Sequence, residues 1–412
     1  MTDTDIQENA TDTVRQVLAD TPIIDGHNDL PSALRARSGY SVEGLDEVRA
    51  DLHTDLPRLR AGGVGAQFWS VFVPSSLSEP EAVVSTLEQI DAVYRLAARY
   101  RDDLRIAYTA ADVEISFAEG RIASLLGVEG GHSLAGSAGV LRALARLGIR
   151  YVTLTHNDNT AWADSATDEP GVGGLDDTGR AIVAELNRIG VLVDLSHTAE
   201  STQRAALAAS SAPVIFSHSS TRSLNDHPRN VGDPVLELLR GNGGVIQLTF
   251  VPDFISPAAY EWSRELKAEK ERLGLSTSWT WPRAPRPGED PAAVAKERAE
   301  ASAAPTDERL LRWRELHPRP DVTAAEVADH VEHAREVAGL EHIGLGGDYD
   351  GVERQPVDLA DVSGYPVLLS ELASRGWSRS ELEALTGRNV LRVLREAEEH
   401  ATEPLWPTTP PR

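Results

Sequence analysis

The 412-residue sequence contains no cysteine, which excludes disulfide bonds, thiolate metal sites, iron–sulfur clusters and cysteine nucleophiles. Lysine is scarce as well: only three of the 40 basic residues are Lys, and all three lie within residues 267–296. A Schiff-base lysine, a P-loop lysine and a carboxylated-lysine metal bridge are therefore not expected elsewhere in the chain. The chemistry of this protein must rest on His, Asp, Glu and Arg.

Positive charge is also scarce, since 64 acidic residues face 40 basic ones and the formal net charge is −24. Such a surface repels phosphate backbones and anionic lipids, so we expect neither nucleic acid nor a membrane as a partner. No apolar run reaches 18 residues, and the first 22 residues are acidic and lack an apolar core. A membrane span and a signal peptide are thus not predicted, and the expected location is cytoplasmic.

Short apolar or β-branched runs alternate with helical segments rich in Ala, Leu, Arg and Glu. Runs such as VLVDL and PVIF are typical of strands that are buried on both faces, as in a parallel sheet. The predicted strands are residues 23–25, 64–73, 122–128, 149–155, 191–196, 214–217, 245–250 and 343–346. Eight strands alternating with helices predict an α/β fold, a (β/α)8 TIM-like barrel. A doubly wound open sheet is the alternative, but no G-x-G-x-x-G fingerprint supports it.

One polar segment interrupts this alternation. We predict a single metallohydrolase domain over residues 1–412, with an N-terminal extension (1–20) and a polar, Pro-rich insert at about 256–321 between the seventh and eighth strands. An insert at this place emerges on the face where barrels keep their active sites. It could be a functional lid or a solvated insertion with local helix.

Most of the predicted strands are followed directly by residues that can bind metals or move protons. The carboxyl ends of barrel strands converge on one mouth, where such residues are typically catalytic. The residues concerned are His27, Asp29, Glu129, His156, His197, His218, Asp348 and Asp350.

Each of these residues alone has an ordinary structural explanation, as a core histidine or a salt-bridge carboxylate. Together, three histidines and two carboxylates can fill two metal sites of nitrogen and oxygen ligands, which suit zinc best. We assign these ligands to His27, Asp29, Glu129, His197 and His218. Glu129 lies centrally in strand order and is the natural bridge between two metals. We expect Asp194 to be structural, and we place His132 and His227 near the mouth but outside the metal site.

Seven motifs, in this order, carry a family resemblance. They are IIDGHNDLP, GVGAQFWSVFVP, GVEGGHSL, YVTLTHNDNTAWADS, GVLVDLSHT, PVIFSHSSTRSLNDHPRNV and HIGLGGDYDGV. The chain resembles the renal (membrane) dipeptidase family of zinc metallopeptidases, in the amidohydrolase superfamily, over residues 22–393. The missing cysteines and signal segment place it nearest to the soluble bacterial branch.

The resemblance implies two Zn²⁺ per chain, with His27, Asp29 and Glu129 on one ion and Glu129, His197 and His218 on the other. It implies that His156 contacts the scissile carbonyl oxygen, that Arg229 holds the substrate's terminal carboxylate and that Asp348 is the acid/base. Asp350 is the alternative acid/base if the strand register places it inward. Phe254 matches a position where some members have an aromatic residue with a hydroxyl group.

The function implied is hydrolysis of dipeptides, including L-D dipeptides, by a hydroxide that bridges the two metals. One alternative is a metal-dependent hydrolase of another small amide, such as an N-acyl amino acid or a lactam. Another is a non-catalytic metal-binding protein that kept the fold, although no expected ligand is missing. The expected partners are a small dipeptide substrate and, from the resemblance only, a second copy in a homodimer.

Overall fold

The sheet at the centre of the molecule consists of nine parallel strands. A computed structural model describes residues 3–275, 281, 284–286, 288–290, 293–294, 296 and 307–406. Within them the strands are β1 Ile23–Asn28, β2 Val64–Phe72, β3 Leu104–Ile106, β4 Ile122–Glu129, β5 Ile149–Thr153, β6 Leu192–Asp194, β7 Ile215–Ser219, β8 Val245–Leu248 and β9 Ile343–Leu345.

Eight of these strands close into a barrel, because β2 pairs with β4 as well as with β1, and β1 pairs with β9. The predicted (β/α)8 barrel is therefore confirmed, and each predicted strand corresponds to one strand of the ring. Strand β3 was not predicted, because its sequence L-R-I contains a charged residue and is not a continuous apolar run. It pairs only with the beginning of β4, Leu104 opposite Ile122, and lies outside the ring.

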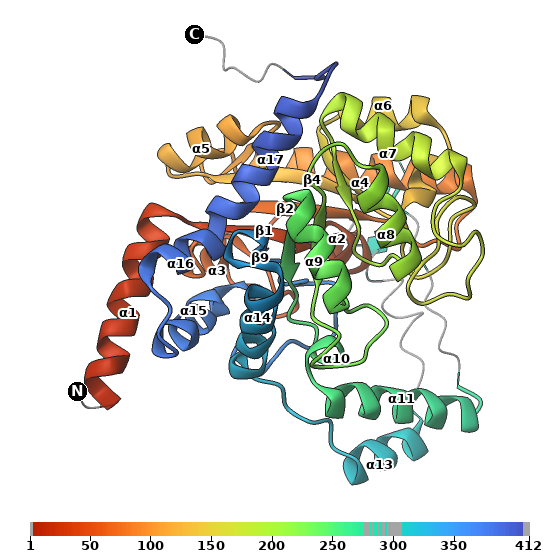
Figure 1. Ribbon diagram of the computed structural model, residues 1–412. Helices are drawn as coiled ribbons and strands as arrows, with labels where there is room; N and C mark the ends of the chain where they lie inside the picture. The colour runs from red at the N-terminus through yellow and green to blue at the C-terminus, as the bar shows by residue number, and fades with distance from the viewer. Residues whose placement is uncertain are drawn as a thin grey trace.

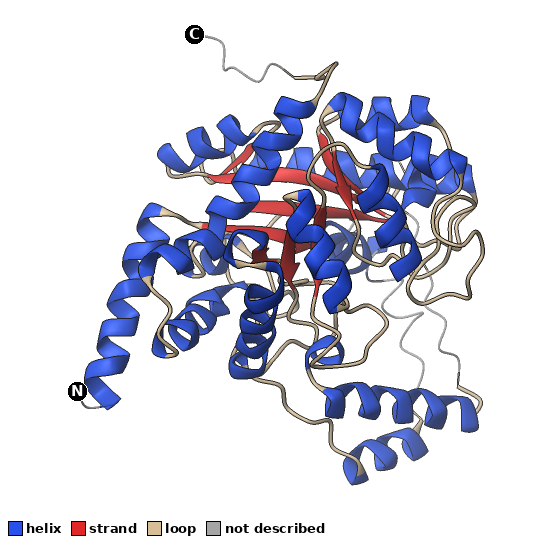
Figure 2. Cartoon of the chain, in the orientation of Figure 1, coloured by secondary structure: helices blue, strands red, loops and turns tan. Residues whose placement is uncertain are grey.

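Helices surround the barrel on its outer side (Figures 1 and 2). In chain order they are α1 Asp3–Asp20, α2 Leu30–Ser38, α3 Leu56–Ala61, α4 Glu79–Arg99, α5 Ala110–Ala118, α6 Ala138–Arg146, α7 Asp177–Ile189, α8 Glu200–Ala209, α9 Asp233–Asn242, α10 Pro252–Ile255, α11 Pro257–Arg272, α13 Glu308–Leu316, α14 Ala324–Ala338, α15 Tyr365–Ser374, α16 Arg379–Glu383 and α17 Asn389–His400. No helix of the described residues is long and apolar enough to cross a membrane.

The barrel is closed at its amino end and open at its carboxyl end. Helix α17 packs Val390 and Val393 against residues at the beginning of several strands, including Ile24 and Ala66. Inside the barrel, the rings of Phe68 and Tyr151 lie 5.3 Å apart between centroids. Apolar side chains thus fill the amino end of the barrel. The polar residues that follow the strands lie at the opposite, carboxyl end.

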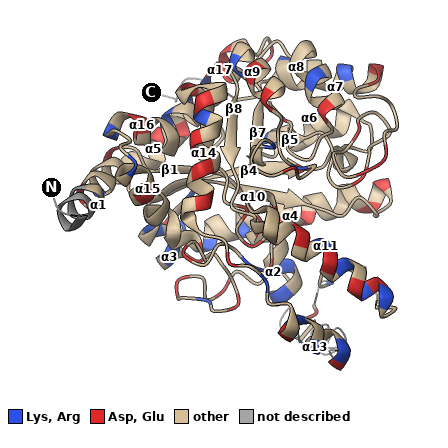
Figure 3. Cartoon of the chain, turned by 60° about the horizontal axis from the view of Figure 1, so that its bottom comes forward, with Lys and Arg blue, Asp and Glu red and all other residues tan. Residues whose placement is uncertain are grey.

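The insert predicted at 256–321 falls partly outside the described residues. Its helices α11 and α13 project from the barrel side by side (Figure 1), and the rings of Trp262 and Trp313 meet between them, tilted at 45° with 6.0 Å between centroids. The Trp262 indole N–H also donates to the His317 carbonyl oxygen at 2.8 Å. Acidic and basic side chains alternate along both helices (Figure 3), as expected for segments exposed to solvent.

His330 links three elements below the mouth of the barrel. This buried residue of α14 accepts hydrogen bonds at Nδ1 from the Thr221 backbone N–H (3.2 Å) and hydroxyl (2.8 Å). Its Nε2–H donates to the Ile255 carbonyl oxygen at 2.9 Å. Burial disfavours the charged ring and lowers the pKa of His330 to about 4.

This linkage predicts a pH-dependent stability. The unfolded chain binds a proton at His330 below about pH 6.5 and the folded chain only below about pH 4. Stability contributed by this residue is therefore lost as the pH falls through that interval, by up to about 1.4 kcal/mol per pH unit. In urea unfolding between pH 7 and 4.5, His330→Gln should show a smaller pH slope than the wild type. Equal slopes in His330→Gln and the wild type would contradict the assignment.

Candidate active site

The carboxyl ends of the strands open into a cavity of about 840 Å³. All of the predicted site residues line this cavity except His27, which lies completely buried beside it. The lining residues predicted from sequence are Asp29, Glu129, His156, His197, His218, Arg229, Asp348 and Asp350. The structure therefore brings the whole predicted set together at one place.

Several of these residues lie on backbone that is unusual for residues with a side chain. Five non-glycine residues of the described ranges have positive φ, and His197 (66°), Asp348 (57°) and Asp350 (64°) are three of them. Such strain costs of the order of 1 kcal/mol per residue and persists only where the surrounding structure enforces it. Its concentration just after β6 and β9 indicates that these turns serve the site.

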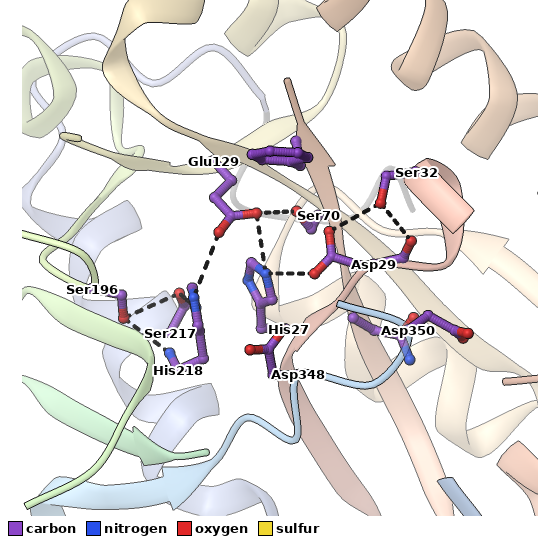
Figure 4. A network of polar contacts seen from close by, with 12 residues as sticks. His27, Asp29, Ser32, Ser70, Glu129, Ser196, Ser217, His218, Asp348 and Asp350 are labelled. Carbon is purple, nitrogen blue, oxygen red and sulfur yellow. Dashed lines mark hydrogen bonds and ion pairs between the residues drawn. The ribbon is translucent and has the colours of Figure 1, made fainter. Parts of the chain in front are cut away.

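The buried carboxylate of Glu129, the last residue of β4, is the centre of the cluster (Figure 4). Its Oε2 lies 3.3 Å from His27 Nε2, which in turn lies 3.3 Å from Asp29 Oδ2. Its other oxygen, Oε1, lies 3.0 Å from His197 Nε2 and 3.6 Å from His218 Nε2. One carboxylate thus faces two sets of ligand atoms, one with each oxygen.

These donor atoms fit metal ions. His27 Nε2 is buried without a hydrogen-bond partner among the described residues, and the Nε2 atoms of His197 and His218 lie only 3.0 Å apart. Burial lowers the pKa of both His197 and His218 well below its usual value, which keeps them neutral as metal binding requires. Burial alone would raise the pKa of Glu129, but the neighbouring His27 and His197 lower it well below its usual value. The neutral imidazoles of His197 and His218 beside the ionised carboxylate of Glu129 could hold a cation.

His156 lies beside this cluster, with Nε2 3.6 Å from Glu129 Oε1. It lies close enough to form a candidate ligand group with Glu129 and His197. Burial lowers the pKa of His156 to about 4, so the ring is neutral at pH 7. The His156 ring also packs on the Phe72 ring. Phe72 in turn contacts the Trp281 ring of the insert edge to face, with 5.7 Å between centroids. The insert thus supports the cavity wall behind His156.

Arg229 is buried without a carboxylate partner in the described part of the chain. Its Nη1 donates to Ser219 Oγ (3.4 Å) and its Nη2 to the His218 carbonyl oxygen (3.2 Å), while Nε has no partner there. Burial lowers the pKa of Arg229 to about 10, which still leaves the guanidinium charged at pH 7. A buried cation that lines a cavity and lacks a counter-ion is a site for an anionic ligand group.

The two aspartates after β9 differ in what they contact. Asp348 approaches His27 and Asp29 closely enough to form a further candidate ligand group. Burial, together with Asp29 and Glu129, raises the pKa of Asp348 well above its usual value. Asp350 Oδ1 instead accepts the His53 backbone N–H at 2.9 Å and anchors its own loop. Of the two aspartates, Asp348 is therefore the one that joins the ligand cluster.

The comparison with known sequences decides the family. The sequence matches the membrane dipeptidase family, peptidase family M19, over residues 11–406. The chain belongs to this family. The resemblance predicted from the seven motifs is confirmed, and the protein is a metallopeptidase of the dipeptidase type.

Individual relatives agree with this membership. Dipeptidase verJ of Clonostachys rogersoniana is 40% identical over 397 residues, covering 93% of this chain and 86% of the relative. The probable dipeptidase PvdM of Pseudomonas aeruginosa has the same fold, with a TM-score of 0.79, 22% identity and coverage of 97% of this chain and 100% of that one. A metallopeptidase of Rhodobacter sphaeroides, solved with a phosphinate mimic of L-Ala-D-Ala, also has this fold. Its TM-score is 0.69 and its identity 21%, with coverage of 92% of this chain and 99% of that one.

The residues that orient the candidate ligands of this dipeptidase were not predicted from sequence. Tyr151 Oη lies 2.9 Å from His27 Nδ1, and Ser70 Oγ donates to Glu129 Oε2 at 2.8 Å. Gly127 makes room for the first of these, since a Cβ there would lie 2.0 Å from Tyr151 Cζ. Both Tyr151 and Ser70 lie inside strands, where they read as ordinary core residues.

Asp194 is structural, as expected, and it also sets the protonation of His218. Its carboxylate accepts the Ser217 hydroxyl at 2.7 Å, and Ser217 Oγ lies 2.8 Å from His218 Nδ1. Because the single Ser217 proton goes to Asp194, the Ser217 oxygen accepts from His218 Nδ1–H. The lone pair of His218 is then on Nε2, which faces Glu129.

This chain of hydrogen bonds predicts that Ser217→Ala weakens metal binding. Loss of the acceptor frees the His218 tautomer and ring, and such losses typically cost about 10- to 100-fold in metal affinity. Competition of the purified protein with a chromogenic chelator for zinc measures this. Ser124→Ala, which removes another buried hydroxyl of the barrel wall, is the matched control and should bind as the wild type does. Unchanged affinity in Ser217→Ala would contradict the role given to the Asp194–Ser217 pair.

Proposed function

We propose that this chain is a binuclear zinc dipeptidase that hydrolyses dipeptides with a free C-terminus, including L-D dipeptides. The observation that carries the proposal is the buried Arg229, which forms no ion pair within the described residues, in the same cavity as the Glu129-centred ligand cluster. A metal site alone fits many hydrolases. A metal site that shares a cavity with a buried cation fits a substrate that carries both a hydrolysable bond and an anionic group.

His27, Asp29 and Glu129 would hold one zinc ion, and Glu129, His197 and His218 the other. All of these ligands are nitrogen or oxygen atoms, as zinc accepts, and the chain has no thiolate to compete. When bound, such a pair of ions supplies a hydroxide nucleophile at neutral pH and an electrophile for the scissile carbonyl. The remaining steps belong to the side chains around them.

Arg229 would bind the terminal carboxylate of the substrate. Its guanidinium is planar and offers a fork of donors that matches a carboxylate. The cavity walls exclude much of the water around it, since only 4% of Arg229 is exposed, and this strengthens the attraction. A carboxylate held here fixes the distance from the chain end to the bond that is cut, which selects the last peptide bond of a substrate with a free C-terminus.

His156 and Asp348 would serve the chemical step. His156 is neutral at pH 7 and can donate a hydrogen bond to the oxygen that develops negative charge, a contact typically worth roughly 3–4 kcal/mol. Asp348, whose pKa is raised, is suited to accept the proton of the nucleophile and to pass it to the leaving amine. The phosphinate mimic of L-Ala-D-Ala bound by the Rhodobacter sphaeroides relative supports inclusion of L-D dipeptides among the substrates.

Metal analysis combined with a substrate panel tests the proposed function. The purified protein, supplied with zinc, should contain two ions per chain and should hydrolyse members of a library of L-L and L-D dipeptides. N-acyl amino acids and lactams in the same panel test the alternative amide substrates. Fewer than two ions, or turnover of an alternative class without turnover of any dipeptide, would overturn the proposal.

Asp348→Asn should reduce kcat on dipeptides by at least about a hundredfold while leaving the metal content unchanged, because it removes the proton acceptor. Asp350→Asn is the matched control, since it makes the same change at a neighbouring aspartate that also has positive φ. Asparagine tolerates positive φ as aspartate does, so the backbone should be kept in both variants. The control should retain most of the activity. Near-normal kcat in Asp348→Asn, or a larger loss in Asp350→Asn, would remove Asp348 from the mechanism.

Arg229→Ala should lower kcat/KM on dipeptides by at least about a hundredfold, because a charged partner of the carboxylate is lost. The same variant should have little effect on the corresponding dipeptide amides, which lack the carboxylate. Arg37→Ala changes the other arginine that lines the cavity, and it should have the smaller effect. Equal losses on acid and amide would show that Arg229 supports the structure and does not bind the carboxylate.

A further inference from the structure

We propose that His227 is a second binding residue for the substrate's terminal carboxylate, to which it donates a hydrogen bond from Nε2–H beside Arg229. This inference rests on the proposed function, in which Arg229 binds that carboxylate. It assigns a role to a histidine that the sequence places outside the metal site. Among the described residues, His227 belongs to none of the candidate metal groups.

The position of His227 is fixed by packing. Its ring lies 4.5 Å from the Phe254 ring and 4.4 Å from the Tyr260 ring between centroids, and only 9% of the residue is exposed. The guanidinium of Arg229 lies 5.2 Å from the same Phe254 ring. His227, Arg229 and Phe254 all line the cavity that contains the ligand cluster. The imidazole and the guanidinium are therefore neighbours on one wall.

The hydrogen bonds of His227 decide which nitrogen carries the proton. The backbone N–H of Arg229 lies 3.1 Å from His227 Nδ1 and can only donate, so Nδ1 accepts and carries no proton. The proton of the neutral ring is then on Nε2. Within the described ranges Nε2 has no hydrogen-bond partner, although the side chain lines the cavity. Burial first, then Arg229 and Arg222, lower the pKa of His227 to about 3, so the ring stays neutral across the range in which the enzyme works.

The carboxylate needs such a donor. It offers about four acceptor positions, whereas Nη1 and Nη2 of Arg229 each already donate one hydrogen bond, to Ser219 Oγ and to the His218 carbonyl oxygen. Phe254, which packs on both side chains, has no hydroxyl to contribute. A neutral N–H adds a hydrogen bond to a charged acceptor without placing a second positive charge beside Arg229. Hydrogen bonds to charged groups are the stronger ones, which makes this donor a significant part of the carboxylate site.

Two substitutions separate binding from local structure. In His227→Asn the amide oxygen can replace Nδ1 as acceptor for the Arg229 N–H, but the donor at the Nε2 position is lost. In His227→Gln the amide nitrogen reaches the Nε2 position and restores a donor, whereas the acceptor for the Arg229 N–H is displaced. Kinetic constants are measured for both variants and the wild type on the best dipeptide and on its amide, with zinc content checked in each protein.

We expect His227→Asn to raise KM for the dipeptide roughly tenfold or more with kcat within about twofold, and to leave kcat/KM for the amide unchanged. His227→Gln should recover part of the dipeptide KM. The reverse pattern, with a normal Asn variant and a defective Gln variant, would show that His227 acts only by supporting the Arg229 backbone and would overturn the inference. Equal effects on dipeptide and amide would overturn it as well. If the wild type hydrolyses no dipeptide, the proposed function itself fails, and this is seen before any variant is compared.

Discussion

The site depends on one buried carboxylate whose two oxygens contact different histidines. Glu129 has 4% exposure, and its two oxygens face His27 on one side and His197 with His218 on the other. A carboxylate in such a place is costly unless cations or donors surround it. The barrel meets this requirement by ending four strands around it: β1, β4, β6 and β7. The direct pairing of β2 with β4, which closes the ring, also places Ser70 where its hydroxyl can donate to Glu129.

The histidines around this carboxylate must be neutral and correctly oriented to bind metals, and the strand interiors provide the orientation. Ser217 and Asp194 set the tautomer of His218, while Tyr151 contacts the far nitrogen of His27. These partners extend from the barrel wall, where packing fixes their rotamers. The same logic operates at the cavity wall, where a backbone N–H sets the tautomer of His227. At His218 the Asp194 carboxylate, which can only accept, and at His227 a backbone N–H, which can only donate, determine the tautomer of the imidazole.

The parts of this structure that the sequence predicts are those with a periodic or positional signal. The eight ring strands are continuous apolar runs, and the residues from His27 to Asp350 that follow them share one rule, that carboxyl ends converge. Tyr151, Ser70 and Ser217 lack such a signal, because a polar residue inside a buried strand looks the same whether it orients a ligand or satisfies a neighbour. Strand β3 was missed because its sequence L-R-I is not a continuous apolar run. The donor role of His227 depends on a single backbone hydrogen bond, which no sequence pattern specifies.

The distribution of charge around the cavity agrees with a zwitterionic substrate. Asp348, Asp350 and Glu353 come from the turn after β9, and Asp29 follows β1, which pairs with β9. Arg229 and His227 come from the loop after β7, with β8 between that loop and the acidic side. Asp29 and Glu129 would be neutralised by bound cations, and Asp350 accepts the His53 N–H, so Asp348 and Glu353 remain to face a positive group. Although the chain has a net charge of −24, charge of one sign does not surround the cavity. The acidic side of the mouth suits the ammonium end of a dipeptide, and the side formed by the loop after β7 suits its carboxylate.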